Sequence, residues 1–358
     1  MSILYSKIDL GQLQLKNHLV MSPMTRCRAT GNIPTSLMAK YYSQRSTAGM
    51  IITEGTSPSP NGLGYPRIPG IFSEAQVEGW KQITAAVHDR GAKIFVQIMH
   101  CGRIAHPLNL PAGAVVMAPS AIVAADEMHT DSAGKQPLPV PREMTGEDIK
   151  NTIAEFTRAA KNAVTAGFDG IELHSANGYL LEQFIRPNTN QRLGNYGGSI
   201  ENRARFVLEV ADAAITAIGK DRVGIRLSPY GVHNDMTLYE TMADDYTYLA
   251  QQLNDRGLRY IHLVDHAAMG APPVPEAIKE TFRTIFKRTL ILSGGYDAAR
   301  AENDLRLGKC DLIAVGRPFL ANPDLPARWK TGAALNELDM ATLYSPGPKG
   351  YTDYPTLK

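Results

Sequence analysis

Three polar side chains follow one apolar run at close spacing. His174 and Asn177 stand three residues apart, and a phenol, Tyr179, follows Asn177. On a chain that turns helically after the run, His174 and Asn177 project to the same side and converge on one acceptor atom. Two donors in that position would bind and polarise a small electrophile. The alternative for either residue alone is a core histidine or an ordinary Asn-Gly turn.

Polar residues also interrupt two other apolar runs. Arg226 lies within Val-Gly-Ile-Arg-Leu, and Gln97 lies within Ile-Phe-Val-Gln-Ile-Met. A buried guanidinium keeps its proton and needs a partner, so Arg226 is expected either to pair with Glu172 or to face a ligand that gains electrons. The amide of Gln97 is either a satisfied core amide or the partner of a heterocycle that presents C=O and N–H side by side. Together the two residues favour an electron-accepting heterocycle.

The elements that must position these residues are short apolar runs that alternate with amphipathic segments. The expected strands are 18–23, 50–55, 93–100, 170–176, 223–229, 260–265, 289–295 and 311–318. The expected helices include 73–89, 145–166, 199–218, 239–255 and 297–307. Eight such alternations predict an α/β fold, a closed (β/α)8 TIM barrel, in a single domain over 1–358. A doubly wound open sheet is the structural alternative.

Other segments decorate this barrel. Residues 7–15 alternate around a glycine and predict an N-terminal β-hairpin. The stretches 101–143 and 186–198 are expected to be long strand-to-helix loops without structure of their own, of the kind that form lids or binding loops. The aromatic tail 350–355 is expected to pack back on the barrel.

Chemistry in such a barrel sits at the carboxyl ends of the strands. Thr25, Gln97, His174 and Arg226 all fall at or near these ends. The loops after the seventh and eighth strands are a frequent phosphate site, and here they contain Ser293, Gly294, Gly295, Gly316 and Arg317. Glycines let backbone N–H groups approach a phosphate, and Arg317 supplies a guanidinium fork, although tight turns require glycine for other reasons too.

Composition narrows the class of partner. The 358 residues are 44 % hydrophobic and carry a net charge of +2, with no basic stripe for nucleic acid. No apolar segment is long enough to span a membrane, and the start of the chain lacks a secretion signal. Cys27, Cys101 and Cys310 are far apart and fit a reducing compartment. We therefore expect a cytoplasmic protein, monomeric or homodimeric, that acts on small molecules.

Metal and dinucleotide motifs are not evident. No carboxylate or cysteine stands at ligand spacing near His174, and His100, Cys101 and His106 lie in a loop without a second pair, so no metal is expected. The segment 62–66, Gly-Leu-Gly-Tyr-Pro, lacks the third glycine and the helix start of a dinucleotide fingerprint.

Several long motifs in order resemble the old yellow enzyme family of FMN-dependent ene-reductases, in particular its bacterial branch of N-ethylmaleimide and pentaerythritol tetranitrate reductases. They are Met-Ser-Pro-Met-Thr-Arg at 21–26, Glu-Leu-His-Ser-Ala-Asn-Gly-Tyr-Leu-Leu at 172–181, the stretch 186–203 with Tyr-Gly-Gly-Ser at 196–199, Gly-Arg at 316–317 and Gly-Tyr-Thr-Asp-Tyr-Pro at 350–355. The similarity runs through essentially the whole chain.

The resemblance implies non-covalent FMN across the barrel mouth. Pro23, Met24 and Thr25 would lie near the reactive flavin edge, with Thr25 bonding O4, Gln97 on the pyrimidine edge and Arg226 beside N1 and O2. Negative charge gathers there in reduced flavin, so Arg226 would tune the redox potential. Further cofactor contacts would come from Gly55, Ser293, Gly294, Gly295, Gly316 and Arg317.

The same resemblance implies the reaction. NADPH or NADH would reduce the flavin and leave, and the activated alkene would follow into the same pocket, which gives ping-pong kinetics. His174 and Asn177 would hold the carbonyl or nitro oxygen, hydride from flavin N5 would go to the β-carbon, and Tyr179 would protonate the α-carbon. Quinones and nitro esters are further expected substrates. Tyr65, Met99 and Tyr351 are the expected pocket walls.

Four positions depart from the family pattern or need comment. Met99 stands where close relatives often have tryptophan, which softens the pocket wall. Asn177 replaces a second histidine of some members, and Gly194 replaces a residue that is commonly acidic. Cys27 lies two residues after the Thr25 position at which one branch of the family has its cysteine, so we expect it to be structural.

Two other classes compete with this interpretation. A lyase or aldolase barrel would use the glycine turns for a phosphorylated substrate, but it would want a lysine or a metal at the mouth. A flavin-binding protein without turnover is the second, and the intact His174 and Tyr179 argue against it.

Overall fold

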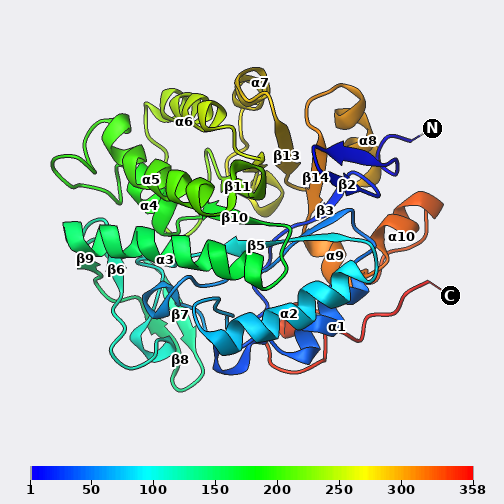
Figure 1. Ribbon diagram of the computed structural model, residues 1–358, viewed down its shortest axis with the longest axis horizontal. Coiled ribbons are helices and arrows are strands. Elements are labelled where there is room, and N and C mark those ends of the chain that lie inside the picture. Colours follow the sequence, from blue (N-terminus) through cyan, green and yellow to red (C-terminus); the bar gives the residue numbers. More distant parts are fainter. Residues whose placement is uncertain (1, 358) are drawn as a thin grey trace.

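The computed structural model describes residues 2–357 as a closed parallel barrel with helices around it (Figure 1). Its strands are β3 (Leu19–Met21), β4 (Met50–Ile52), β5 (Lys93–Ile98), β10 (Gly170–Ser175), β11 (Val223–Leu227), β12 (Tyr260–Val264), β13 (Thr289–Ser293) and β14 (Leu312–Val315). Each strand lies inside its predicted range, and β14 pairs with β3 to close the barrel. The predicted (β/α)8 barrel is confirmed, and the open sheet is excluded.

The five predicted helices are also present. They are α2 (Glu74–His88), α3 (Gly146–Thr165), α5 (Ile200–Ile218), α6 (Met242–Arg256) and α8 (Ala298–Arg306). Capping boxes begin two of them, since Gln76 donates to the Ser73 hydroxyl and Asp148 donates to the Thr145 hydroxyl through their backbone N–H groups. The structure has further helices whose ranges were not specified in advance: α1 (Ser36–Gln44), α4 (Leu180–Ile185), α7 (Glu276–Ile285), α9 (Arg317–Ala321) and α10 (Leu325–Thr331).

The barrel interior changes from apolar to polar along the strands. Near the amino-terminal ends of the strands, the interior is a buried apolar cluster that includes Val20, Met50, Phe95, Tyr260 and Leu312. Inward side chains recur every second residue, so the next inward layer on β5 and β12 holds polar residues instead. The predicted hairpin, β1 (Ile8–Leu10) and β2 (Leu13–Leu15), joins the apolar cluster through Leu10 and Leu15. The apolar end is therefore closed, and the polar end remains as the mouth.

The segment after β5 was predicted to be a loop without structure of its own, and this prediction was wrong. It contains an antiparallel hairpin, β7 (Glu127–Thr130) with β8 (Gly134–Pro137), and β6 (Met117–Ala118) pairs with β9 (Arg142–Glu143). The hairpin turn is closed by a hydrogen bond from the Thr130 hydroxyl to the carbonyl of Gly134, whose φ is +68°. Residues 186–198 contain no helix or strand, as expected.

The tail does pack back, and buried arginines hold it. Arg26 donates to the carbonyl of Gly350 at 2.8 Å, and Arg28 donates to the carbonyl of Thr342 at 2.7 Å. The Tyr351 ring is fully buried and stacks on Tyr41 with ring centroids 4.0 Å apart.

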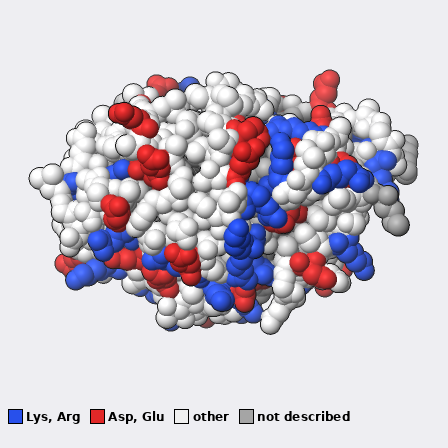
Figure 2. All heavy atoms as spheres, turned by 90° about the horizontal axis from the view of Figure 1, so that it is seen from above, with Lys and Arg blue, Asp and Glu red and all other residues white. Residues whose placement is uncertain are grey.

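Surface charge is mixed in sign. On the face seen in Figure 2, Lys and Arg side chains lie among Asp and Glu side chains. Ion pairs such as Arg256 with Asp212, at 2.8 Å, occur at the surface between partly exposed and exposed side chains. Within residues 2–357, none of the helices has the length and hydropathy that a membrane-spanning helix needs.

Candidate active site

A chain of hydrogen bonds crosses the upper barrel interior. Gln97 donates its amide to Glu172 at 2.8 Å, the other oxygen of Glu172 contacts Nδ1 of His262 at 2.9 Å, and Nε2 of His262 contacts the Ser293 hydroxyl at 3.0 Å. The Ser293 hydroxyl also donates to the carbonyl of Leu263. Both oxygens of Glu172 are therefore engaged, and Ser293 points into the barrel rather than out of the mouth.

Arg226 lies beside these hydrogen-bonded residues and has no bonded partner of its own within residues 2–357. It is aligned in the sheet with His174 on one side and His262 on the other. Among the residues that the structure describes, no hydrogen bond or ion pair reaches its guanidinium, and its Nε is buried. The expected alternative, an ion pair with Glu172, does not form. Burial lowers the pKa of Arg226, while the more distant charge of Glu172 opposes the shift.

His174 is also unsatisfied. Its Nδ1 is buried and has no hydrogen-bond partner among residues 2–357. Burial, followed by the nearby Arg226 and His262, lowers the pKa of His174 well below its ordinary value. The ring is therefore neutral at pH 7, and one of its nitrogens carries a proton that it can donate.

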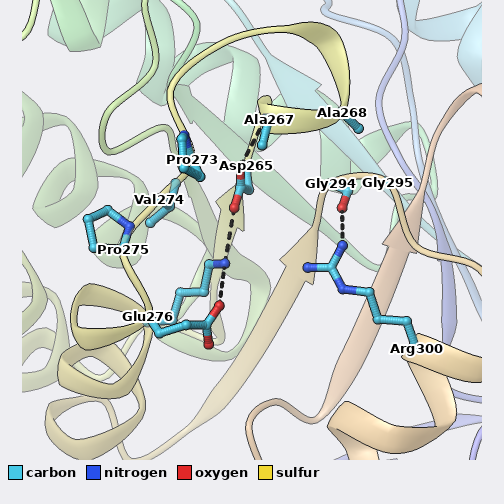
Figure 3. A pocket seen from close by; sticks show the side chains of 11 residues that line it. Asp265, Ala267, Ala268, Pro273, Val274, Pro275, Glu276, Gly294, Gly295 and Arg300 are labelled. Atoms are coloured by element: carbon cyan, nitrogen blue, oxygen red, sulfur yellow. Dashed lines mark hydrogen bonds and ion pairs between the residues drawn. The ribbon is translucent and has the colours of Figure 1, made fainter.

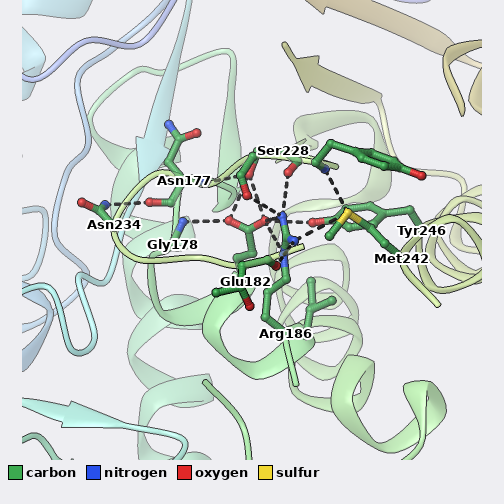
Figure 4. Close-up of polar contacts among 12 residues, drawn as sticks. Asn177, Gly178, Glu182, Arg186, Ser228, Asn234, Met242 and Tyr246 are labelled. Carbon is green, nitrogen blue, oxygen red and sulfur yellow. Dashed lines mark hydrogen bonds and ion pairs between the residues drawn. The ribbon is translucent and has the colours of Figure 1, made fainter. Parts of the chain in front are cut away.

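The turn after β10 is fixed by backbone hydrogen bonds (Figure 4). Asn177 and Gly178 both have positive φ, at 58° and 75°. The N–H of Asn177 donates to the Ser228 hydroxyl at 2.8 Å, and its carbonyl accepts from the Asn234 amide at 2.7 Å. The N–H of Gly178 donates to Glu182 at 2.7 Å. A left-handed asparagine is uncommon, and these bonds hold it in place.

Behind the turn lies a buried ion pair that prediction missed. Arg186 and Glu182 pair at 2.9 Å, one helical turn apart and both almost fully buried. Glu182 also accepts from Tyr246 at 2.8 Å, and Arg186 donates to the carbonyls of Ser228 and Gly231. The available signal was the i, i+4 spacing of an acid, Glu182, and a base, Arg186.

The Asn177 side chain has a partner that the sequence did not indicate. Its Oδ1 lies 2.7 Å from Nε2 of His266, in the loop after β12. His266 is 89 residues away in the chain, so no local pattern links the two residues. Hydrogen bonds therefore hold both the backbone and the side chain of Asn177.

Tyr179 lies close to His174 and to a second phenol. The rings of Tyr179 and His174 have centroids 4.9 Å apart, and the hydroxyls of Tyr179 and Tyr65 are 2.9 Å apart. Tyr179 is buried, and burial raises its pKa above the ordinary value. It is therefore protonated at neutral pH. Tyr65 is half-buried and packs with Met99 in the same apolar cluster as Tyr179.

Pro23, Met24 and Thr25 follow β3 at the rim, with Met24 and Thr25 partly exposed. The next backbone N–H, of Arg26, donates to buried Glu54 at 3.1 Å and fixes the direction of this segment.

Gly55 serves packing at this point. A Cβ on it would come within 2.5 Å of the Met99 sulfur, so its bare backbone leaves room for that side chain. This packing role does not test the predicted cofactor contact of Gly55, which stays a prediction.

The predicted phosphate turns lie at neighbouring strand ends. Gly294 and Gly295 have φ of 135° and 64°, and a Cβ on Gly294 would approach the carbonyl of Asp265 to 2.3 Å. Gly316 precedes α9, and Arg317 is exposed. A cavity of about 430 Å³ adjoins Gly294 and Gly295, and its wall includes Arg300, which donates to the Gly294 carbonyl (Figure 3).

Tyr351 does not fit its prediction as a pocket wall. Its ring faces Tyr41, Arg26 and Arg28 inside the packed tail. A different tail tyrosine, Tyr344, is exposed, and its charge influences the pKa of both Tyr65 and Tyr179. The sequence offered several tail tyrosines and no local signal to choose between them.

The cysteines are free and buried. Burial raises the pKa of the Cys27 thiol to about 12, so it is an unreactive thiol. No group of three or more His, Cys, Asp or Glu side chains arranged for a metal occurs within residues 2–357.

Comparison with known proteins identifies the family. Residues 3–336 match the sequence profile of the NADH:flavin oxidoreductase / NADH oxidase family. The chain is 43 % identical over 361 residues to 12-oxophytodienoate reductase 1 of Oryza sativa subsp. japonica, covering 99 % of this chain and 93 % of that protein.

Solved structures agree. Morphinone reductase superposes with a TM-score of 0.96 at 43 % identity, over 99 % of this chain and 96 % of that chain. The old yellow enzyme homologue from Zymomonas mobilis superposes with a TM-score of 0.94 at 40 % identity, over 99 % of each chain. Morphinone reductase has also been solved in complex with tetrahydroNAD.

The barrel, its polar mouth and these likenesses define an FMN-dependent oxidoreductase of the ene-reductase type. The chain belongs to the NADH:flavin oxidoreductase / NADH oxidase family, the family of old yellow enzyme. The resemblance seen in the sequence is confirmed, and the lyase alternative is excluded.

Proposed function

We propose that the protein reduces the activated C=C bond of α,β-unsaturated carbonyl or nitro compounds, with FMN as its cofactor and NADPH or NADH as reductant. The observation that carries the proposal is the buried, unpartnered Arg226, aligned with His174 at the barrel mouth. A cation buried without a partner is costly, and an anionic or electron-accepting ligand removes that cost.

The residues present fit FMN. Arg226 offers a fixed cation to the flavin pyrimidine, and Gln97, whose amide also donates to Glu172, offers an amide. Pro23, Met24 and Thr25 form the rim above.

The phosphate of FMN would lie at the paired glycines Gly294 and Gly295, with Gly316 and Arg317 on the next strand end. Successive backbone N–H groups in a turn can form a concavity that suits an anion, and glycine lets the anion approach closely. Ser293 supports the phosphate site indirectly. Its hydroxyl contacts His262 and Leu263 inside the barrel and fixes the end of the strand.

FMN, held by these residues, would supply hydride transfer from the nicotinamide coenzyme to the β-carbon of the alkene. His174 and Asn177 bind the carbonyl or nitro oxygen and polarise the double bond. His174 is neutral because of burial and the adjacent Arg226, so it donates a hydrogen bond without adding a full charge. Donors placed before the reaction stabilise the charge that develops on that oxygen.

Tyr179 delivers the proton to the α-carbon. Burial raises its pKa, which keeps the phenol protonated until the substrate becomes basic. The Tyr65 hydroxyl, 2.9 Å from the Tyr179 hydroxyl, is within hydrogen-bonding distance to return a proton to it. The order of events is ping-pong, because coenzyme and alkene use one mouth; the complex of morphinone reductase with tetrahydroNAD supports a nicotinamide coenzyme in this barrel type.

Quinones and nitro esters are proposed as further substrates. The pocket wall around Tyr179 contains Met99 and Tyr65, in the same apolar cluster. Methionine is unbranched and flexible, so this wall adapts to acceptors of different shape. The named relatives fit such a range, since they include a 12-oxophytodienoate reductase and a morphinone reductase.

The test begins with the purified protein. Bound FMN is measured by its absorbance, anaerobic reduction is followed with NADPH and with NADH, and reoxidation is followed with 2-cyclohexenone, a nitroalkene, a quinone and a nitro ester. We expect rapid reoxidation by the first two. A protein that binds no flavin after FMN is added, or whose reduced flavin none of these acceptors reoxidises, would contradict the proposal.

Tyr179→Phe separates the proton donor from the rest of the site. Reoxidation by 2-cyclohexenone should slow about 10²-fold or more, and reduction by NADPH should be nearly unchanged. Tyr351→Phe is the matched control, because its hydroxyl is buried without a partner in the tail. Equal losses in both half-reactions of Tyr179→Phe would argue against a proton donor.

A further inference from the structure

The Asn177 amide can face the mouth in two ways. With Nδ2 toward the substrate it donates a hydrogen bond, and with Oδ1 toward the substrate it only accepts. The two orientations occupy the same volume, so packing alone does not choose between them. A carbonyl or nitro oxygen needs the donor.

The position of this amide is restricted to these two choices. The backbone of Asn177 is fixed at φ 58° by the Ser228 hydroxyl and by Asn234. The neighbouring Gly178 is fixed by Glu182. Only the side-chain torsions of Asn177 remain free, and the contact with His266 at 2.7 Å limits them.

The residue before His266 is fixed by several contacts. It follows β12, where the N–H of Asp265 donates to the carbonyl of Ser293 and the Asp265 side chain accepts from the N–H of Ala267. Lys279 pairs with Asp265 at 3.0 Å. The His266 ring is partly buried, and the His233 ring lies 6.1 Å away. These contacts fix the backbone from which the His266 ring extends toward Asn177.

We propose that His266 is a positioning residue that sets the orientation of the Asn177 amide. An Nε2–H of His266 donates to Oδ1 of Asn177, and this leaves Nδ2 to donate to the substrate oxygen beside His174. The pair then selects substrates that present a hydrogen-bond acceptor, namely carbonyl and nitro groups. The inference deepens the proposed function and rests on it.

The protonation state of His266 agrees with this geometry. Burial, and after it the charge of Arg226 and His233, lowers the pKa of His266 to about 4. A neutral imidazole has one N–H, and when that proton lies on Nε2 the Asn177 atom 2.7 Å away must accept it, which places Oδ1 there.

An isosteric pair of variants tests the proposal. In His266→Gln the amide nitrogen replaces the donor, whereas in His266→Glu a carboxylate accepts from Nδ2 of Asn177 and turns Oδ1 toward the substrate. We expect 2-cyclohexenone turnover within about 5-fold of wild type for His266→Gln. For His266→Glu we expect a loss of about 10²-fold, close to that of Asn177→Ala.

The double variants remove the effect of the added charge. In the Asn177→Ala background no amide is left to orient, so Gln and Glu at 266 should give equal turnover. Equal turnover of the two single variants, or the same Gln-to-Glu ratio with and without Asn177, would overturn the proposal. FMN content and thermal midpoint are measured for each variant, so that loss of cofactor or fold is recognised.

Two measurements do not depend on turnover. The dissociation constant of 4-chlorophenol, read from the flavin spectrum, should rise about 10-fold or more in His266→Glu and little in His266→Gln. The ¹⁵N shifts of the His266 ring in the wild-type protein should show a protonated Nε2 and a bare Nδ1 at pH 7. A bare Nε2 overturns the proposal even where a variant fails to fold. A wild-type protein that reduces no enone or nitroalkene, yet has a protonated Nε2, contradicts the proposed function and leaves the Asn177 geometry standing.

Discussion

Arg186 and Arg226 are both buried, but they differ in their bonded partners. Arg186 is paired with Glu182 and donates to several carbonyls, whereas Arg226 has no bonded partner among residues 2–357. Burial alone lowers the pKa of a guanidinium; at Arg186, Tyr246 and Glu182 outweigh burial and raise the pKa, and at Arg226 burial prevails. A buried charge with its partners in the chain maintains structure, and one without them indicates a ligand.

The largest expected effect is the loss of stability when Arg186, the paired arginine, is replaced. Arg186→Met leaves Glu182 buried without its cation, and such losses cost about 3–5 kcal/mol of unfolding free energy. Arg226→Met removes an unpaired charge from the apoprotein and should not destabilise it. Urea unfolding of the two apoproteins, followed by circular dichroism, compares them directly. Similar losses would mean that both arginines are structural.

Glu54 is a buried acid, and its burial should make the stability of the protein depend on pH. Burial raises the pKa of Glu54 from 4.5 to about 7, although Arg26 and Tyr42 lie near it. The native state therefore binds more protons than the unfolded chain between pH 4.5 and 7, so this contribution to stability is present below 4.5 and is lost as pH rises through 7. The change is at most about 3 kcal/mol. Unfolding free energies of wild type and Glu54→Gln across this window should differ in slope, and parallel curves would contradict the assignment.

Arg226 should matter most when FMN is present. Its charge-assisted contacts to the flavin are worth about 1.5–3 kcal/mol, so Arg226→Met should raise the FMN dissociation constant about 10- to 100-fold. Arg226→Lys keeps the charge without the guanidinium fork and should fall between. Fluorescence titration of the apoproteins with FMN gives the constants. Unchanged affinity in Arg226→Met would show that the unpaired cation serves another purpose.

The smallest effect concerns the turn that carries Asn177. Ser228→Ala leaves the Asn177 N–H without its partner and removes a donor to Glu182, which together cost about 1–2 kcal/mol. Ser6→Ala, at an exposed hydroxyl, is the matched control. Thermal unfolding of both variants measures the difference, and the KM for 2-cyclohexenone reports on the turn. A Ser228→Ala protein as stable as Ser6→Ala would show that the turn is held by other contacts.

Much of the fold was predictable because its signals are local. Strand and helix periodicity, the caps at Ser73 and Thr145, and the alternation of elements each depend on residues within one turn or strand. The prediction for segment 101–143 was wrong, since its hairpin and short sheet pair residues of low strand propensity. Their pairing depends on the surface beneath them.

The site was predictable only in part. His174, Asn177, Tyr179, Gln97 and Arg226 could be singled out because a polar residue in an apolar run is itself unusual. Tyr351 could not be separated from Tyr344, because both are tail tyrosines and only packing decides which one stacks on Tyr41.

The sequence by itself thus determined the barrel, the position of the mouth and the residues that bring chemistry to it. Tertiary structure alone decided the pairings: Glu172 with Gln97 and His262 rather than Arg226, Glu182 with Arg186, and Asn177 with His266. The physical reason is the closure of the barrel, which brings together side chains from strand ends far apart in the chain. Periodicity shows which face a residue takes, but not the partner it meets across the barrel.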